Sequence, residues 1–427
     1  MSDHLITELG GGVRVASERV PAVRSVALGF WIGTGSITED DSQAGLSHLL
    51  EHMLFRGTAR YGSEEIDQIF DAMGAELNAG TGKETTSVYA RVLDIHLERA
   101  FDVIAQMVTA PAISGLAEER AVVLEEIAMY EDDPQDIVFD VLGDAIFPGH
   151  PLGRAILGHA DVVAGATRQQ LLAFHKERYF SQNIVIAAAG NVDHEQIVAW
   201  AEAAMNAAER PAPALSAPPP PGDDRPRHAF RKKDTEQYHV CLGGVGLARD
   251  DERRFTLRVL DSLTGGTSSS RLFQAVREQR GLAYSIFTFQ SLYSGTGQVG
   301  LYVGTRGENL AEVVRVIDDE LERVRSEPVS EEELERAKDN VKGRVVLAME
   351  STTARMERLG ASILAEMPIL ELDEVIERID AVDAASVTTL ASELFDPARL
   401  SAAAIGPDES VFRSALEPLS AKLQPAS

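Results

Sequence analysis

A proline-rich segment near the middle of the chain constrains its fold more than any other feature. Residues 209–230 read ERPAPALSAPPPPGDDRPRHAF and include four consecutive prolines, at 218–221. Because proline fixes φ and lacks a backbone N–H, such a run is extended and continues neither a helix nor a central strand. The 427 residues also exceed what one ordinary hydrophobic core organises. We therefore predict an N-terminal domain at 1–208, a linker at 209–230 and a C-terminal domain at 231–427.

The two predicted domains share an order of elements. Apolar strand-like runs occur at 25–33 and 239–247. Each run is followed by an amphipathic helical stretch, two strands joined by a short turn, and a long helix. Short turns between strands favour antiparallel pairing with helices packed on the sheet. We expect an α+β fold of two homologous domains, each a mainly antiparallel sheet with helices, facing each other across a cleft.

A constant offset between the halves supports this duplication. Adding 216 to Glu119 gives Glu335, and adding 216 to Gly190 gives Gly406, so two distant points align with one shift. Internal repetition of this kind indicates that one structural unit was duplicated.

Composition excludes several classes of function. The net charge of -27 opposes binding to nucleic acid or to an anionic membrane surface, since both need basic patches. There is no run of 18 apolar residues and no leader-like N-terminus, so we expect a cytoplasmic protein without membrane spans. The single cysteine, Cys241, lies in an apolar run, so no intrachain disulfide can form and a core position is expected.

The pentad HLLEH at 48–52 carries the strongest chemical signal. His48 and His52 are four residues apart in a helical stretch, so both rings project from one face and can reach one metal ion. Glu51 lies beside the second histidine, in the inverted order of a zincin motif, where a carboxylate can take a proton from water. The alternative is that both histidines are polar residues on the rim of a core helix.

A third metal ligand is needed, because catalytic zinc usually takes three protein ligands. The acidic helical stretch at 117–133 is the best source. Glu119 and Glu126 are seven residues apart there, hence two turns apart on one helix face. The alternative is a solvated acidic helix.

Four segments together resemble the insulinase/pitrilysin family of zinc metallopeptidases, in its mitochondrial-processing-peptidase-like bacterial branch. They are GLSHLLEHMLFRGT (45–58), GAELNAGTGKETT (74–86), EERAVVLEEI (118–127) and SSSRLFQAVREQRGLAYSI (268–286). The likeness spans nearly the whole chain in the right order. It implies a fold of two homologous domains and a peptidase that uses Zn²⁺.

The resemblance also implies roles for individual residues of the first domain. His48, His52 and Glu126 match the zinc ligands, and Glu51 matches the general base. Glu119 matches an accessory glutamate that can orient a ligand. A substrate peptide is then expected to add as a strand beside Asn78 and Ala79.

The second domain is expected to differ chemically from the first. The repeat offset carries Glu126 onto Lys342, which cannot bind zinc while charged, and no second pentad exists. Arg277 and Tyr284 match a pair that the family's C-terminal domain presents to the substrate. Because this one chain retains both the zinc-site residues and the Arg277–Tyr284 pair, we expect a monomer or homodimer rather than a complementary heterodimer.

These features predict a zinc-dependent endopeptidase acting on peptides or unfolded segments. Two alternatives remain: a noncatalytic structural subunit of the family, and a module that binds peptides without cutting them.

Overall fold

The computed structural model describes residues 4–205, 225–417, 419 and 424–425, and these form two compact units. The first unit draws its described residues from 1–128, 155–218 and 346–371. The second draws them from 129–154, 219–345 and 372–427. Most of the predicted linker, 209–230, lies outside the described residues, and its last four residues already belong to a strand.

A six-stranded sheet organises the first unit. Its strands are β1 (His4–Glu8), β2 (Arg14–Arg19), β3 (Ser25–Ile32), β4 (Glu76–Thr81), β5 (Thr86–Leu93) and β6 (Ile184–Gly190). Their order is β1-β2-β6-β3-β5-β4, and every pair is antiparallel except β2 with β6. The central strand β6, IVIAAAG, is buried at all seven positions. A strand that is apolar throughout, instead of alternating, indicates cover on both faces of the sheet.

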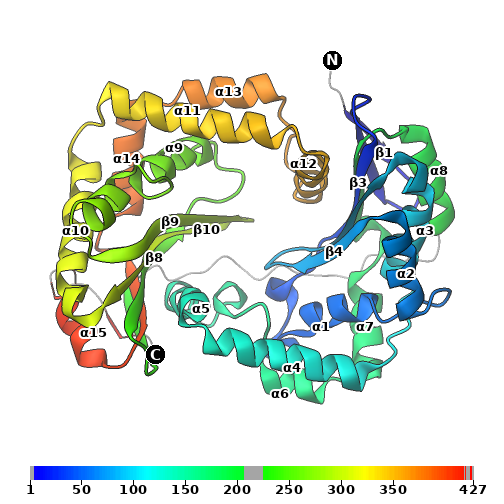
Figure 1. Cartoon of the computed structure of the whole chain (residues 1–427), viewed down its shortest axis with the longest axis horizontal. Helices are drawn as coiled ribbons and strands as arrows, with labels where there is room; N and C mark the ends of the chain where they lie inside the picture. Colours follow the sequence, from blue (N-terminus) through cyan, green and yellow to red (C-terminus); the bar gives the residue numbers. More distant parts are fainter. Residues whose placement is uncertain (1–3, 206–224, 418, 420–423, 426–427) are drawn as a thin grey trace. The chain divides into compact units, whose positions relative to one another are not determined.

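The first unit's own helices pack with one face of this sheet (Figure 1). They are α1 (Leu46–Leu54), α2 (Ser63–Met73), α3 (Leu97–Thr109), α6 (Ala160–Gly165), α7 (Arg168–Arg178) and α8 (His194–Met205). Helix α4 (Leu116–Asp132) begins in this unit and contributes its buried Val123 and Ile127 to the same core.

The other face is covered by α12 (Thr352–Leu364), which lies beyond the proline-rich segment in sequence. Met356, Leu359 and Ile363 of α12 pack on a row of small side chains of the sheet: Ala16, Ala27, Val185, Ala187 and Ala189. A Cβ at Gly29 would lie 2.5 Å from Sδ of Met356, so the helix approaches the backbone closely. Small residues on the sheet make that approach possible.

The second unit repeats this plan. Its strands are β7 (Arg227–Lys232), β8 (Gln237–Gly246), β9 (Ala283–Tyr293), β10 (Thr296–Arg306), β11 (Ser401–Gly406) and β12 (Gln424–Pro425), in the order β12-β7-β11-β8-β10-β9. Cys241 of β8 is fully buried, as expected. The unit's helices are α9 (Arg254–Thr264), α10 (Leu310–Ser326), α11 (Glu331–Ala348), α13 (Leu372–Asp380), α14 (Ala384–Leu394) and α15 (Glu409–Ala415), together with α5 (Pro134–Ile146) from the first half of the sequence.

The α+β fold of two similar, mainly antiparallel sheets with helices is therefore confirmed. The compact units, however, are not the contiguous ranges 1–208 and 231–427. Helix α5 packs on β8 and β11, and α12 packs on β3 and β6, so each half of the sequence lends one helix to the other unit's sheet. The exchange covers the sheet face that each half's own helices leave open. No helix in the described part of the chain is both long and apolar enough to cross a membrane.

Candidate metal centre

Helix α1 carries the histidine pentad and is anchored by an apolar face whose side chains are fully buried: Leu49, Leu50, Met53 and Leu54. His48 lies at the border of that face and is 8% exposed, whereas the His52 side chain is 21% exposed. Their ring centroids are 4.6 Å apart and the rings meet edge to face. The four-residue spacing thus brings both imidazoles to the same side of the helix, as predicted.

The start of α1 is held by a buried carboxylate. Glu39, 2% exposed, accepts hydrogen bonds from the backbone N–H groups of Gly45 (2.9 Å) and Ser47 (2.6 Å). An anion at a helix N-terminus satisfies otherwise unpaired N–H groups and interacts favourably with the helix dipole. Gly45 has φ of 99°, and a Cβ there would lie 2.6 Å from the carbonyl oxygen of Leu157, so only glycine fits.

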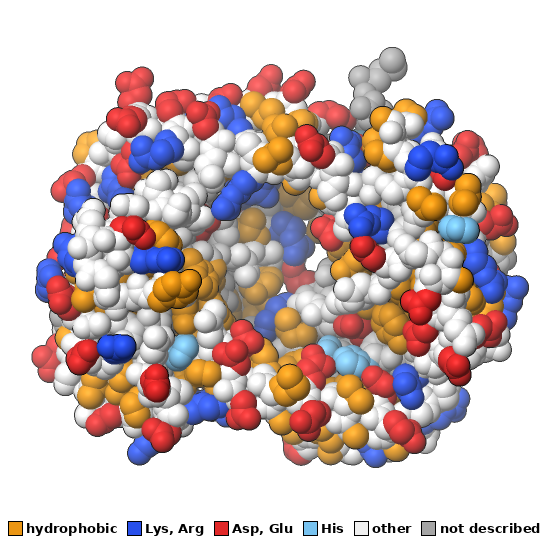
Figure 2. All heavy atoms as spheres, viewed as in Figure 1, with side chains coloured by type: hydrophobic (Ala, Val, Ile, Leu, Met, Phe, Trp, Pro, Cys, Tyr) orange, Lys and Arg blue, Asp and Glu red, His pale blue; other side chains and the backbone are white. Residues whose placement is uncertain are grey.

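Helix α4 brings a carboxylate to the two histidines. Oε1 of Glu126 lies 3.6 Å from Nε2 of His48, and its Oε2 lies 3.3 Å from Nε2 of His52. These three residues form a group whose ligand atoms all lie within 4.8 Å of one another. Figure 1 shows α1 beside α4, and Figure 2 shows histidine side chains bordered by acidic ones over these helices. The sequence-predicted ligands are therefore brought together.

Glu119, two turns before Glu126 on α4, contacts the opposite edge of one imidazole. Its Oε1 lies 2.9 Å from Nδ1 of His52, and its Oε2 lies 3.3 Å from Nε of Arg56. An ionised carboxylate only accepts hydrogen bonds, so Nδ1 of His52 carries the proton and Nε2 presents its lone pair to the cluster.

The protonation of His48 also suits metal binding. Burial lowers the pKa of His48 to about 4, and the neighbouring His52 lowers it further. Desolvation disfavours the charged imidazolium, so the ring is neutral near pH 7. A neutral imidazole is the form that binds a metal.

Glu51 extends from α1 toward the end of β4. The hydroxyl of Thr81 donates a hydrogen bond of 2.5 Å to its Oε2. Burial raises the pKa of Glu51, and Glu126 adds to that effect, whereas the Thr81 hydrogen bond and His52 lower it. A partly buried carboxylate with a raised pKa is a stronger proton acceptor than an exposed one.

The strand that leads to Thr81 is an edge of the first sheet. Asn78 pairs with Tyr89 and Ala79 with Val88, so β4 is bonded to β5 on one side, and no second neighbour of β4 occurs among the described strands. The Asn78 side chain also accepts a hydrogen bond from the N–H of Ala79. A free strand edge can accept another extended chain.

Arg277 and Tyr284 lie together in the second unit. Arg277 is in a short π-helix (Phe273–Glu278), and its guanidinium carbon lies 4.5 Å from the ring centroid of Tyr284. The same guanidinium lies 4.7 Å from the ring of Phe273. Tyr284 is 76% exposed, so the pair is assembled at a surface of that unit.

Comparisons with known proteins identify relatives over most of the chain. Residues 14–160 match the family model described as Insulinase (Peptidase family M16), and residues 165–341 match the one described as Peptidase M16 inactive domain. An uncharacterized zinc protease of Streptomyces coelicolor is 40% identical over 410 residues, which cover 94% of this chain and 89% of that relative. The chain belongs to peptidase family M16. An uncharacterized zinc protease of Bacillus subtilis is 40% identical to this M16 chain over 386 residues, covering 90% and 94% of the two.

Solved structures share the fold of this M16 chain. A peptidase M16 inactive domain from Pseudomonas fluorescens superposes with a TM-score of 0.87 at 22% identity, covering 95% of this chain and 99% of its own. A protease from Helicobacter pylori gives a TM-score of 0.87 at 20% identity, with the same coverage. At this identity the likeness supports the architecture alone.

The donor set of this M16 chain fits a zinc ion. Two imidazole nitrogens and one carboxylate are a ligand set used by catalytic zinc sites that keep one position open. Glu119 fixes the tautomer of His52, and the lowered pKa of His48 keeps the second ligand neutral. His48, His52 and Glu126 are the residues that would hold the ion.

Three positioning contacts were not anticipated from the sequence: those of Glu39, Arg56 and Thr81. Glu39 lies seven residues before the start of α1, too far for an N-cap pattern to reveal it. Arg56 falls just after the helix and reaches Glu119 across 63 positions of sequence. Only Thr81 lies in a segment that the sequence had singled out, because it ends LNAGT within the family-like residues 74–86.

Proposed function

We propose that this chain is a zinc-dependent endopeptidase that hydrolyses peptide bonds in peptides or extended protein segments. The observation that carries the proposal is the convergence of His48, His52 and Glu126 beside a second acidic group, Glu51, which is held by its own hydrogen bond. Zinc at this position would supply Lewis acidity, polarising a carbonyl oxygen and acidifying water.

The residues of the chain would perform the proton transfers. Glu51 takes a proton from the attacking water and delivers it to the nitrogen of the leaving amine. Its raised pKa makes Glu51 a stronger proton acceptor than an exposed carboxylate, which favours the first of these steps. Thr81 keeps one oxygen of Glu51 engaged, so the other oxygen is directed to the reaction.

The substrate would be an extended polypeptide. The free edge of β4 offers main-chain groups near Asn78 and Ala79, and an added strand uses backbone hydrogen bonds that do not depend on sequence. We propose that Arg277 and Tyr284 also contact the peptide, with the tyrosine hydroxyl as a hydrogen-bond donor to the developing oxyanion. A cytoplasmic location and a homodimer complete the proposal.

The test combines metal analysis with cleavage. Purified protein is assayed for zinc and incubated with a peptide library, with and without a chelator, and products are identified by mass spectrometry. We expect bound zinc and chelator-sensitive cleavage. Glu51→Gln should retain zinc and lose about 10²- to 10⁴-fold in turnover, the usual contribution of general acid–base catalysis.

The outcomes separate the alternatives. Zinc binding without cleavage by the wild type would favour a noncatalytic peptide-binding protein, an alternative suggested by the description "inactive domain" for the segment 165–341. Full activity in Glu51→Gln would remove the role assigned to that residue. Absence of bound zinc would overturn the proposal as a whole.

A further inference from the structure

We propose that Arg56 is a positioning residue for the metal centre, acting through Glu119 on His52. This inference rests on the proposed function, since it concerns the zinc ligand His52. Glu119 is contacted on both carboxylate oxygens, by Nδ1 of His52 at 2.9 Å and by Nε of Arg56 at 3.3 Å. The Glu119 side chain is only 12% exposed, so water can do little to hold or neutralise it.

The second contact matters because of how a glutamate side chain moves. The terminal torsion of glutamate is broad, so a carboxylate held at one oxygen can still rotate about its last bond. A cation at the other oxygen restricts that rotation. A largely buried carboxylate is also costly without a compensating charge, and Arg56 supplies one. Arg56 therefore fixes the plane of the carboxylate that orients His52.

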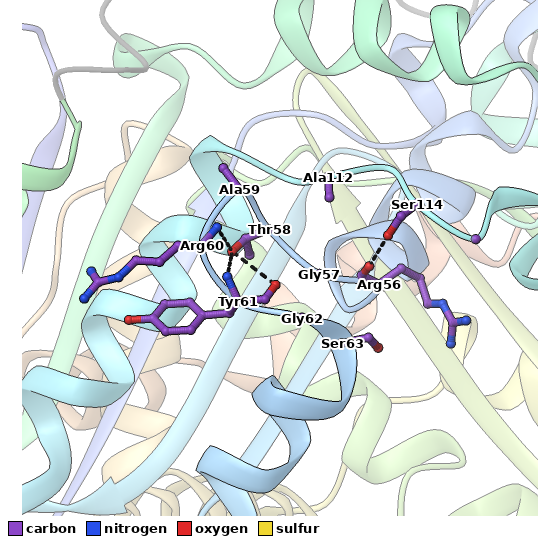
Figure 3. Close-up of a pocket in the computed structure, with 11 residues that line it drawn as sticks. Arg56, Gly57, Thr58, Ala59, Arg60, Tyr61, Gly62, Ser63, Ala112 and Ser114 are labelled. Atoms are coloured by element: carbon purple, nitrogen blue, oxygen red, sulfur yellow. Dashed lines mark hydrogen bonds between the residues drawn. The ribbon is translucent and has the colours of Figure 1, made fainter.

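The loop that carries Arg56 is fixed by hydrogen bonds to its backbone. The hydroxyl of Ser114 donates to the carbonyl oxygen of Arg56 (2.6 Å), and that of Ser63 donates to the carbonyl oxygen of Phe55 (2.9 Å). The N–H of Tyr61 donates to the hydroxyl of Thr58 (2.8 Å), which tightens the turn. Residues 56–63, together with Ala112, Ser114 and Gly115, line a cavity of about 420 Å³ (Figure 3).

A glycine keeps space for the guanidinium. Gly115 has φ of 66°, and a Cβ there would come within 3.3 Å of Nη2 of Arg56. The start of α4 is thus shaped to admit the arginine beside Glu119. The loop after α1 and the turn before α4 therefore both position the contact between Arg56 and Glu119.

The same loop provides a matched control. Figure 3 shows the side chains of Arg56 and Arg60 leaving the loop in opposite directions. Arg60 pairs with Asp102 at 3.1 Å instead of with Glu119. Replacing either arginine by methionine removes one positive charge from the same loop, but only Arg56→Met removes the contact to the metal centre.

The experiment measures zinc affinity by competition with a chromogenic chelator, the visible absorption spectrum of the cobalt-substituted protein, and kcat and KM for a peptide found to be cleaved. We expect Arg56→Met to weaken zinc binding about tenfold, at the low end of the range for residues that orient a metal ligand. Its cobalt spectrum should change and kcat should fall more than KM rises. Arg56→Lys should recover part of the affinity, because it keeps the charge but not the planar geometry.

Arg60→Met should match the wild type in zinc affinity and spectrum. Equal affinities and spectra in Arg56→Met and Arg60→Met would overturn the positioning role. If Arg56→Met does not fold, Arg56→Gln replaces it, because glutamine keeps a polar donor and removes the charge. Its zinc affinity and cobalt spectrum are then compared with those of Arg60→Gln. A wild-type protein that binds no zinc would instead overturn the proposed function, so the two failures are distinguishable.

Discussion

The guanidinium carbon of Arg277 lies 4.5 Å from the ring centroid of Tyr284. The same carbon lies 4.7 Å from the ring centroid of Phe273, so the guanidinium contacts two aromatic rings. Cation–π contacts of this kind orient a guanidinium without using its N–H donors. Arg277 lies in a π-helix, a local distortion that often occurs at functional sites. The second unit therefore carries a preassembled pair at its surface, in which Nε of Arg277 also lies 3.7 Å from Oε1 of Glu278.

Tyr284→Phe tests the hydroxyl of this pair separately from its ring. The phenyl ring should still hold Arg277, so folding and zinc content should be unchanged. If the hydroxyl stabilises the oxyanion, turnover should fall about 10²-fold, as when one donor is removed from such a site. Tyr284→Leu, which removes the ring as well, should cost more. The turnover of each variant is measured by steady-state kinetics on a peptide that the wild type cleaves. Wild-type turnover in Tyr284→Phe would leave the hydroxyl without a catalytic role.

Glu126→Gln tests the third member of the cluster. A neutral amide is a much poorer zinc ligand than a carboxylate, so the zinc dissociation constant should rise by at least about tenfold. Glu125→Gln is the matched control, because Glu125 is the neighbouring exposed residue of α4 and lies outside the cluster. Metal analysis after dialysis against graded chelator gives both values. Equal zinc retention by the two variants would exclude Glu126 as a ligand.

Local periodicity was enough to predict many of the helices and strands of this fold. It did not predict which sheet each helix packs on. The apolar runs at 25–33 and 239–247 became β3 and β8, because buried strands have a local signature. The 216-residue repeat offset carries α5 onto residues 350–362, which nearly coincide with α12. Both helices were therefore detectable as equivalent elements. Nothing in either amphipathic pattern specifies which sheet the helix covers, so the exchange of helices between the two halves of the sequence was missed.

The residues of the candidate site likewise differ in how far the sequence could predict them. His48 and His52 were predicted from a four-residue spacing on one helix, which is local geometry. Glu126 is 74 positions after His52, and its choice among the acidic residues of α4 needed the family resemblance. Arg56 and Glu39 act through contacts that depend on how loops close in three dimensions. Single-sequence patterns contain no signal for such contacts.

The metal-free protein should lose stability in acid because of His48. Its pKa is about 4 in the folded protein and 6.5 for an unperturbed histidine. Between these values the unfolded chain binds more protons, so the free energy of unfolding falls as pH falls from about 6.5 to about 4. The loss from this residue is on the order of 3 kcal/mol. Denaturant titrations in chelator should show it, and His48→Gln should have a shallower dependence on pH across that window. An identical pH dependence in both proteins would contradict the burial effect.

The exchanged helix α12 should depend on a buried carboxylate of the first sheet. Glu18 on β2 is 2% exposed, and its two oxygens contact Nη1 of Arg355 and, at 3.0 Å, Nη2 of Arg358. Removing one partner of a buried ion pair typically costs 3–5 kcal/mol, because the remaining charge is left uncompensated. The arginines are 26% and 23% exposed, so we expect about 3 kcal/mol for Glu18→Gln.

Hydrogen exchange localises that effect to the helix. Amides of α12 should exchange faster in Glu18→Gln, by an amount equivalent to about 3 kcal/mol in opening free energy. Glu371→Gln is the control, since Glu371 makes only a 3.9 Å contact with His4 and its side chain is 52% exposed. A long contact of this kind, in which the carboxylate is exposed, is worth about 0–1 kcal/mol. Equal exchange in the two variants would mean that apolar packing of Met356, Leu359 and Ile363 alone holds α12 on the sheet, and that the ion cluster serves only to set its register.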